Sequence, residues 1–164
     1  MKMMQITCNE MKLVGITART NNKQLFETDP EVNIVAATVQ KYFYNQLAEK
    51  ILHRISPSRT LCVYTNYASD VNGDYTYFIG EEVSSFDGVG SEFSTLTIPK
   101  HSYLKFTNQP GPMPAVCINM WQKIWQMTAA ELGYERAYQA DFEVYDERSI
   151  DHNNVELDIY LSVT

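Results

Sequence analysis

The sequence predicts an α+β fold, built as a pseudo-two-fold duplicate of strand-helix-strand-strand modules with antiparallel sheets. Segments in which apolar and polar residues alternate are separated by two long segments with helical spacing. The same order of elements occurs in the halves 1–88 and 89–164, although these share no obvious residue identity. A chain of 164 residues is long enough for a single domain with a well-buried core.

The first half is predicted to contain a strand, a helix and two further strands. The first strand is expected over Met11–Arg19. A long helix is expected over Pro30–Ile55, because Asp29 can cap it, a proline suits its first position and apolar residues then recur every three or four positions. Two strands, Leu61–Tyr67 and Tyr75–Val83, follow on either side of a turn rich in aspartate, asparagine and glycine.

The second half repeats this order with one added strand. Its predicted elements are two strands, a helix and a closing pair of strands, at Phe93–Ile98, Tyr103–Phe106, Met113–Ala130, Tyr138–Asp146 and Val155–Val163. Gly133 marks the end of the helical region. The loop Ser84–Gly90 separates the halves, and its two glycines leave open whether it is a lid or a linker.

The closing pair of strands places acids beside tyrosines. In the first of these strands, Phe142 and Val144 alternate with Glu143 and Tyr145. In the second, aliphatic residues alternate with two acids and Tyr160. We expect the hairpin to offer one apolar face to the core and one face of acids and tyrosines.

A cleft is expected between the two halves. If each helix covers one face of its own sheet, the helix-free faces can approach each other near the pseudo-two-fold axis. Glu143 would then line this cleft. Tyr64 is expected on the same helix-free side, because it alternates with Leu61 and Val63. The side of Tyr77 is ambiguous, since its neighbours are also aromatic.

Composition argues against several classes of function. A net charge of -7, without a basic run longer than a pair, argues against direct nucleic-acid binding. Three cysteines without a close pair and three widely spaced histidines favour neither a disulfide framework nor a metal site, and we expect no cofactor. No apolar run is long enough to span a bilayer and no signal peptide is visible, so we expect a cytoplasmic protein without a membrane partner.

Several motifs follow one another in a characteristic order. They are Ile98–Tyr103 with its proline and tyrosine, Trp121–Trp125, Gly133–Arg136, Asp141–Asp146 and Val155–Leu161. In this order and spacing the chain resembles the gyrase-inhibitor-like (GyrI-like) effector-binding family, which includes the drug-sensing domains of AraC-type and MerR-type transcription regulators. The resemblance covers nearly the whole chain and is strongest from Pro99 onward.

The resemblance implies a ligand cleft between two modules, with Glu143 as its charged group. In drug-binding members, a glutamate in a phenylalanine-glutamate-x-tyrosine motif meets the positive charge of lipophilic cations. A carboxylate in an aromatic-walled cleft attracts a cation more strongly than one in water. We therefore expect a stand-alone effector-binding protein that binds a small lipophilic molecule, cationic or aromatic, with Glu143 as charge partner.

Aromatic residues around Glu143 are the further candidates for ligand contact. They are Tyr64, Tyr77, Trp125, Tyr145 and Tyr160. Tyr145 shares the strand face of Glu143, whereas the position of Tyr160 depends on the register of the hairpin. Trp121 lies one helical turn before Trp125, a spacing typical of core packing, and we assign Trp121 to the core.

Two other functions stay open at this point. A glutamate in an apolar cleft can also act as general acid or base, so Glu143 could serve a GyrI-like hydrolase of electrophilic small molecules, although no nucleophile-base motif is visible. The protein could also act as a protein-protein inhibitor or through a protein partner, as gyrase-binding relatives do. Neither reading adds a candidate residue to those named above.

Overall fold

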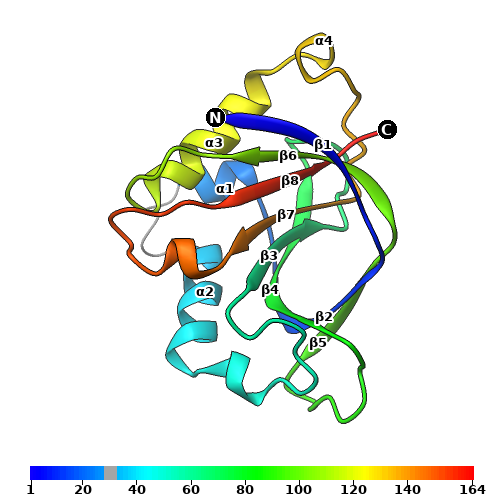
Figure 1. Ribbon diagram of the computed structural model, residues 1–164, viewed down its shortest axis with the longest axis vertical. Coiled ribbons are helices and arrows are strands. Elements are labelled where there is room, and N and C mark those ends of the chain that lie inside the picture. The colour runs from blue at the N-terminus through cyan, green and yellow to red at the C-terminus, as the bar shows by residue number, and fades with distance from the viewer. Residues whose placement is uncertain (28–32) are drawn as a thin grey trace.

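The computed structural model describes residues 1–27 and 33–164. These residues form one antiparallel sheet and several short helices (Figure 1). The strands are β1 (Lys2–Cys8), β2 (Met11–Asn21), β3 (Thr60–Thr65), β4 (Asp74–Val83), β5 (Ser94–Ile98), β6 (His101–Thr107), β7 (Ala140–Tyr145) and β8 (Asp158–Ser162). The helical segments are α1 (Asn22–Glu27), α2 (Ile34–Tyr44), η1 (Leu47–Lys50), α3 (Ala115–Gln126), α4 (Ala129–Leu132) and η2 (Glu147–Ser149).

The strand order has the pseudo-two-fold symmetry that the sequence predicts. Across the described ranges the sheet runs β1-β6-β8-β7-β3-β4-β2-β5. Each strand of the first half has a counterpart four numbers later in the second half, so that β1 corresponds to β5 and β4 to β8. If every strand is replaced by its counterpart, the same order is obtained in reverse. The pseudo-two-fold axis therefore passes between the two central strands, β3 and β7. The predicted α+β duplicate is confirmed, with the sheets of the two halves joined into one.

The sequence prediction missed strand β1. This strand pairs with β6 over its whole length, from Lys2 opposite Thr107 to Cys8 opposite His101. None of its residues is buried, so its pattern carries no core signal. With β1 included, each half has two strands before its helices and two after them. The first strand of each half extends the other half's part of the sheet, since β1 pairs with β6 and β5 with β2.

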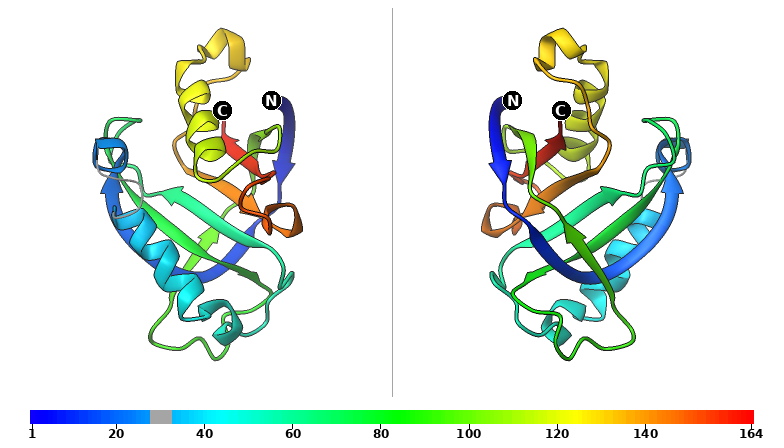
Figure 2. Two further views of the ribbon diagram at one scale, coloured as in Figure 1. Left: turned by 90° about the vertical axis from the view of Figure 1, so that its left-hand side faces the viewer. Right: turned by 90° about the vertical axis from the view of Figure 1, so that its right-hand side faces the viewer.

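The sheet has an apolar core on each face. On one face, α2 packs against β2 and β4, and α3 packs against β6 and β8 (Figures 1 and 2). On the other face, the twisted sheet folds back on itself, so that Leu13 and Ile98 share a core cluster with Tyr103 and Phe142. The predicted approach of the helix-free faces is correct, but they meet in this filled core. The expectation that Glu143 lines a cleft between them is therefore wrong.

The first predicted helix, Pro30–Ile55, is shorter than expected. It ends at Tyr44, because Gln46 adopts a left-handed conformation with φ 50°, and the separate helical turn η1 follows. At the start of α2, the Asn33 side chain accepts a hydrogen bond from a backbone N–H of the first turn. The predicted start with Asp29 as N-cap lies outside the described residues.

The second predicted helix is divided in two. Met127 is extended, with ψ 133°, and separates α3 from α4. The Thr128 hydroxyl then caps α4 by accepting a hydrogen bond from the Glu131 backbone N–H at 3.2 Å. Gly133 ends α4 with φ 77°, which confirms the predicted stop signal.

The register between β7 and β8 corrects the predicted faces of the closing hairpin. Glu143 lies opposite Ile159, and Phe142 lies opposite Tyr160. The rings of Phe142 and Tyr160 stack with their centroids 4.6 Å apart in the helix-free core. Residues directly opposite on antiparallel strands point to the same side. Tyr160 therefore lies on the face away from Glu143, and the prediction that they share a face is wrong.

The loop 84–90 packs against the apolar cluster that α2 forms with β2 and β4. Phe86 and Val89 are partly buried against the cluster that contains Tyr42, and Lys12 Nζ lies 5.9 Å from the centroid of the Phe86 ring. The loop supplies no residue to the pocket described below. These contacts are those of a packed linker between β4 and β5.

Candidate ligand-binding site

Glu143 lies near the centre of the sheet on its helix-bearing face. Residues directly opposite one another form a row across six strands, namely Ile16, Ile79, Cys62, Glu143, Ile159 and Phe106. All the members of this row except Glu143 are apolar, and Glu143 itself is only 2% exposed. A carboxylate removed from water in this way needs hydrogen-bond or charge partners.

Three neutral donors meet the Glu143 carboxylate in the described part of the chain. Tyr64 Oη on β3 and Trp121 Nε1 on α3 donate hydrogen bonds to Oε2 at 2.6 and 2.7 Å. Tyr145 Oη on β7 donates to Oε1 at 2.6 Å. None of the ion pairs among the described residues includes Glu143. The carboxylate therefore has neutral donors on both oxygens and no cationic partner there.

Burial keeps the two phenols in their donating, protonated form. Desolvation, followed by the charge of Glu143, raises the pKa of Tyr64 well above its ordinary value. The pKa of Tyr145 is raised by desolvation, by Cys117 and by Glu143. Burial also raises the pKa of the Cys117 thiol, whose Sγ lies 3.5 Å from Tyr145 Oη. This cysteine is therefore not poised as a reactive thiolate.

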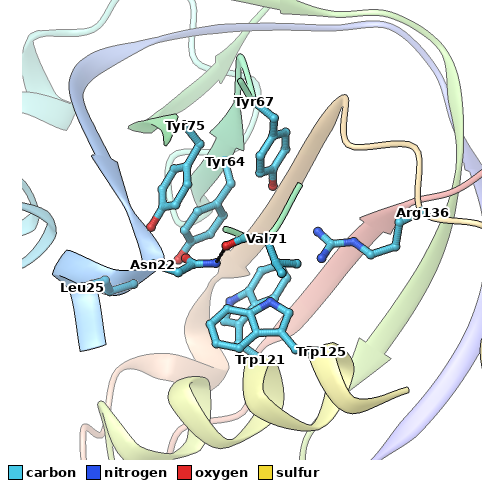
Figure 3. Close-up of a pocket in the computed structure, with 9 residues that line it drawn as sticks. All are labelled: Asn22, Leu25, Tyr64, Tyr67, Val71, Tyr75, Trp121, Trp125 and Arg136. Carbon is cyan, nitrogen blue, oxygen red and sulfur yellow. Dashed lines mark hydrogen bonds between the residues drawn. The ribbon is translucent and has the colours of Figure 1, made fainter. Parts of the chain in front are cut away.

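An open pocket lies beside this carboxylate, between α3 and the tyrosines of β3, β4 and the connecting loop (Figure 3). The lining residues are Asn22, Leu25, Tyr64, Tyr67, Val71, Tyr75, Trp121, Trp125 and Arg136. Because Tyr64 and Trp121 line the pocket and also hydrogen-bond Glu143, the carboxylate lies directly behind the pocket wall.

The aromatic rings of the pocket support one another. The Tyr64 ring lies 5.4 Å from the Tyr75 ring and 5.2 Å from the Trp121 ring, both in edge-to-face geometry. The Trp121 and Trp125 rings are 6.4 Å apart and tilted. Figure 3 shows the two indoles on one side of the pocket and the tyrosines on the other. Aromatic walls of this kind can bind an organic cation through the negative faces of their rings.

A second buried carboxylate, Asp141, differs from Glu143 in having a cationic partner. Arg136 Nη2 lies 2.8 Å from Asp141 Oδ2. Tyr67 Oη donates to the same oxygen at 2.6 Å, and the Ser162 backbone N–H donates to Oδ1 at 2.6 Å. The charge of Asp141 is thus compensated by Arg136.

The structure brings most of the predicted site residues together. Tyr64 and Trp125 line the pocket, and Tyr145 donates to Glu143. Tyr77 lies behind the wall, with its ring 5.4 Å from that of Tyr64. These residues lie on the helix-bearing face, so the predicted group is assembled there and not in the space between the helix-free faces.

Two predicted assignments change. Tyr160 is packed on Phe142 in the helix-free core and does not line the pocket. Trp121 is buried in the core as predicted, but its indole also lines the pocket and donates to Glu143. Its helical spacing to Trp125 could not distinguish these roles, because one side chain fulfils both.

Six pocket residues were not predicted as site residues, namely Asn22, Leu25, Tyr67, Val71, Tyr75 and Arg136. Tyr75 has the strand parity of Tyr77, so the alternation could have suggested it. Arg136 belongs to the motif Gly133–Arg136 that supported the family resemblance. No local sequence pattern indicates that α1 and the β3–β4 loop contribute residues to the pocket wall.

The groups that the described residues bring to this site are a carboxylate without an ion-pair partner among them, phenols, indoles and a paired guanidinium. Across 1–27 and 33–164, no group of three or more histidine, cysteine or acidic residues could hold a metal ion. Within the same ranges, no helix has the length and apolar character needed to cross a membrane. The arrangement can bind a charged aromatic molecule or exchange a proton with it.

Comparison with known proteins places this chain in a family. Residues 6–163 match the family model of the integron-associated effector binding protein, Cass2. YobU of Bacillus subtilis (strain 168), named as a candidate transcriptional regulator, is 26% identical over 153 residues, which cover 93% of this chain and 91% of YobU.

Two solved structures share the fold over nearly the whole chain. The integron cassette protein Cass2 from the mobile metagenome of Vibrio cholerae is 25% identical, with a TM-score of 0.76 over 99% of this chain and 95% of its own. The structure of SAV2435 bound to tetraphenylphosphonium is 15% identical, with a TM-score of 0.79 over 100% of this chain and 94% of its own. The resemblance to the GyrI-like effector-binding proteins is confirmed, and the chain belongs to the integron-associated effector binding protein family.

Proposed function

We propose that this protein binds a small lipophilic aromatic cation in the pocket beside Glu143, and that Glu143 is the charge partner of this ligand. The observation that carries the proposal is a buried carboxylate with three neutral donors and, among the described residues, no ion-pair partner. Such a charge attracts a cation more strongly than a solvated carboxylate does. A delocalised organic cation is weakly hydrated and loses little on entering the pocket.

The pocket walls suit a ligand with several aromatic rings. Trp121 and Trp125 lie on one side of the pocket and Tyr64 and Tyr75 on the other, and the rings of Trp121 and Tyr64 are in contact, with their centroids 5.2 Å apart (Figure 3). Each ring that meets a cation through its face contributes about 0.5–2 kcal/mol. Arg136, the cationic residue of the wall, is already paired with Asp141 and so does not cancel the charge of Glu143.

The negative charge acts on the pocket through two side chains. Tyr64 and Trp121 each line the pocket on one side and hydrogen-bond Glu143 Oε2 on the other. A cation seated against these rings is separated from the carboxylate by one side chain.

The relatives support ligand binding in a regulatory setting. The family name describes effector binding, and SAV2435 was solved with tetraphenylphosphonium, a lipophilic cation. YobU is named as a candidate transcriptional regulator. The role we propose is therefore to sense or sequester the ligand, and to report its presence to a protein partner such as gyrase or a regulator.

Binding is favoured over catalysis by the partners of Glu143. A general base must aim a lone pair at the proton that it removes. Here both carboxylate oxygens already accept short hydrogen bonds from phenol or indole donors. The nearby thiol of Cys117 has its pKa raised by burial and so does not supply a nucleophile. A hydrolase that uses Glu143 is for this reason the second candidate.

Titration with tetraphenylphosphonium tests the proposal directly. The two tryptophans of the chain both line the pocket, so their fluorescence reports occupancy. Glu143→Gln keeps the shape of the side chain and removes its charge, and we expect it to raise the Kd about tenfold or more. Equal Kd values for the wild type and a folded Glu143→Gln variant would rule out the charge-partner role.

Glu81 offers a matched control. It is another buried acid on the helix-bearing face, where Tyr42 Oη and Thr60 Oγ1 donate to its Oε2 at 2.7 and 2.8 Å. It does not line the pocket. Glu81→Gln should therefore leave the Kd of tetraphenylphosphonium unchanged, and a rise equal to that of Glu143→Gln would show that only the net charge matters.

A further inference from the structure

Two buried carboxylates lie behind the wall of the pocket. Asp141 and Glu143 are two positions apart on β7 and therefore share one face of the sheet. The Oδ2 atom of Asp141 accepts hydrogen bonds from Tyr67 Oη at 2.6 Å and Arg136 Nη2 at 2.8 Å, and both donors belong to residues that line the pocket. Its Oδ1 atom accepts from the backbone N–H and the hydroxyl of Ser162. Oδ2 is therefore the oxygen on the pocket side, and it is covered by Tyr67 and Arg136.

The two carboxylates differ in one kind of partner. The pocket-side oxygen of Glu143 accepts from two neutral donors of the wall, a phenol and an indole. The pocket-side oxygen of Asp141 accepts from one neutral donor and from the guanidinium of Arg136. Without this guanidinium, the described residues would leave a second buried negative charge beside the pocket. The charge of the pocket therefore depends on Arg136.

The positive charge of Arg136 is compensated from one side. Its Nη2 atom contacts Asp141, whereas its Nε and Nη1 atoms have no hydrogen-bond acceptor among the described residues. The guanidinium also lies 4.2 Å from the centroid of the Tyr138 ring, which helps to hold it in place. Figure 3 shows the guanidinium reaching toward the pocket. A positive charge of a ligand beside Arg136 would be repelled, with little water between them to screen the repulsion.

We propose that Arg136 limits the pocket to ligands with one positive charge, because it occupies the position from which Asp141 would otherwise attract a second one. This inference rests on the proposed function, since it assigns the first positive charge to Glu143. A monocation compensates Glu143 and leaves the pair of Arg136 and Asp141 intact. A dication of the same shape has a second charge to place in a pocket whose charged lining residue, in the described part of the chain, is Arg136.

Methyl viologen and N-methyl-para-tolylpyridinium are matched probes for this limit. They have the same shape, because the second compound has a carbon in place of one of the two charged nitrogens. Isothermal titration calorimetry gives both Kd values at physiological ionic strength, where the net charge of the chain is largely screened. The readout is the ratio of the two Kd values, because a loosened pocket wall affects both probes alike. In the wild type the monocation should bind about threefold more tightly, or better.

Three variants change the charges one at a time and together. Arg136→Gln removes the cation and leaves the Asp141 carboxylate, so it should shift the ratio about tenfold in favour of methyl viologen. Asp141→Asn leaves the guanidinium without its carboxylate and should shift the ratio in favour of the monocation. The double variant removes both charges, and its ratio should lie within about twofold of the wild-type ratio. Asp141→Asn keeps the size and shape of the side chain, so it tests the proposal even if Arg136→Gln does not fold.

The possible failures can be told apart. A ratio that is the same in the wild type, Arg136→Gln and Asp141→Asn would overturn this inference, and the proposed function would stand if Glu143→Gln still weakened binding of the monocation. A shift in the same direction in both single variants would overturn it as well, because the shape of the wall and not its charge would then be responsible. If the wild type bound neither tetraphenylphosphonium nor the tolyl compound, the proposed function would fail and this inference with it.

Discussion

Trp121 Nε1 on α3 donates a 2.7 Å hydrogen bond to Glu143 Oε2 on β7. The indole is 6% exposed and the carboxylate 2% exposed, so this is a buried bond to a carboxylate, a stronger class than bonds between neutral groups. The other buried residues of α3, Met120 and Ile124, pack in an apolar cluster. Apolar contacts are not directional, so they do not fix the orientation of the indole ring. The bond to Glu143 therefore orients a ring that also lines the pocket.

Replacing the indole tests this coupling. Trp121→Phe removes the donor and part of the ring, so we expect the free energy of unfolding to fall by about 3 kcal/mol. In a Glu143→Gln background the same change should cost about 1 kcal/mol less, because the bond to a neutral amide is weaker. Urea unfolding of the wild type, both single variants and the double variant gives this difference. Additive losses would contradict a direct coupling between the two side chains.

The two tyrosines that donate to Glu143 should contribute to stability in a similar way. Tyr64→Phe and Tyr145→Phe each leave one carboxylate oxygen with one donor fewer. We expect each variant to lower the free energy of unfolding by about 1–3 kcal/mol. Tyr103→Phe, on the opposite face, should lower it less than either, because among the described residues the Tyr103 hydroxyl has no carboxylate partner to lose. Thermal unfolding of the three variants is the measurement, and equal values for all three would contradict the hydrogen-bond network.

The alternation within β7 was enough to predict that Glu143 and Tyr145 share a face. The faces of β7 and β8 relative to each other depend on their register, and a slip of one residue inverts them. A long connection, which contains η2, joins these strands, so no tight turn sets the register in the sequence. Tyr160 was therefore assigned to the wrong face, although the alternation of β8 itself was recognised.

The pocket wall shows what local sequence patterns cannot supply. Asn22 Nδ2 on α1 donates to the Val71 carbonyl oxygen at 2.9 Å and so joins segments 49 residues apart. Arg136 is brought to the pocket by a bridge to Val163 at the end of the chain. The pseudo-repeat and the apolar stripes predicted the sheet and the two helical regions, since these depend on residue periodicity. The wall depends on long-range pairing, which periodicity does not encode.

Glu81 gives the protein a predictable pH response. Burial raises the pKa of Glu81 in the folded state, although hydrogen bonds from Tyr42 and Thr60 act in the opposite direction. The folded protein therefore binds this proton more tightly than the unfolded chain, and its stability falls as pH rises through the folded-state pKa. In urea unfolding, Glu81→Gln should gain stability relative to the wild type when the pH is raised from 5 to 7. A constant difference between the two proteins over this range would contradict the raised pKa.

Gly15 and Gly80 permit two strands to approach closely. They lie opposite each other on β2 and β4, and a Cβ on Gly15 would collide with the Ile79 carbonyl oxygen. We expect Gly15→Ala to lower the free energy of unfolding by about 3 kcal/mol, as overpacking against rigid backbone does. Gly133→Ala is a useful comparison, because a Cβ there meets no atom within 4 Å and only its φ of 77° opposes it. It should cost about 1 kcal/mol, and equal losses in denaturant unfolding would argue against the collision.

Tyr160 tests the corrected faces of the hairpin. Its ring stacks on Phe142 in the helix-free core, and the sheet lies between it and Glu143. Tyr160→Phe keeps this stack, so the Kd of tetraphenylphosphonium should stay within about twofold of the wild-type value. Tyr64→Phe changes a residue that lines the pocket and contacts Glu143, and it should change the Kd by more than this. Fluorescence titration of both variants measures these two Kd values. A large change in Tyr160→Phe together with no change in Tyr64→Phe would mean that the ligand occupies the other face of the sheet.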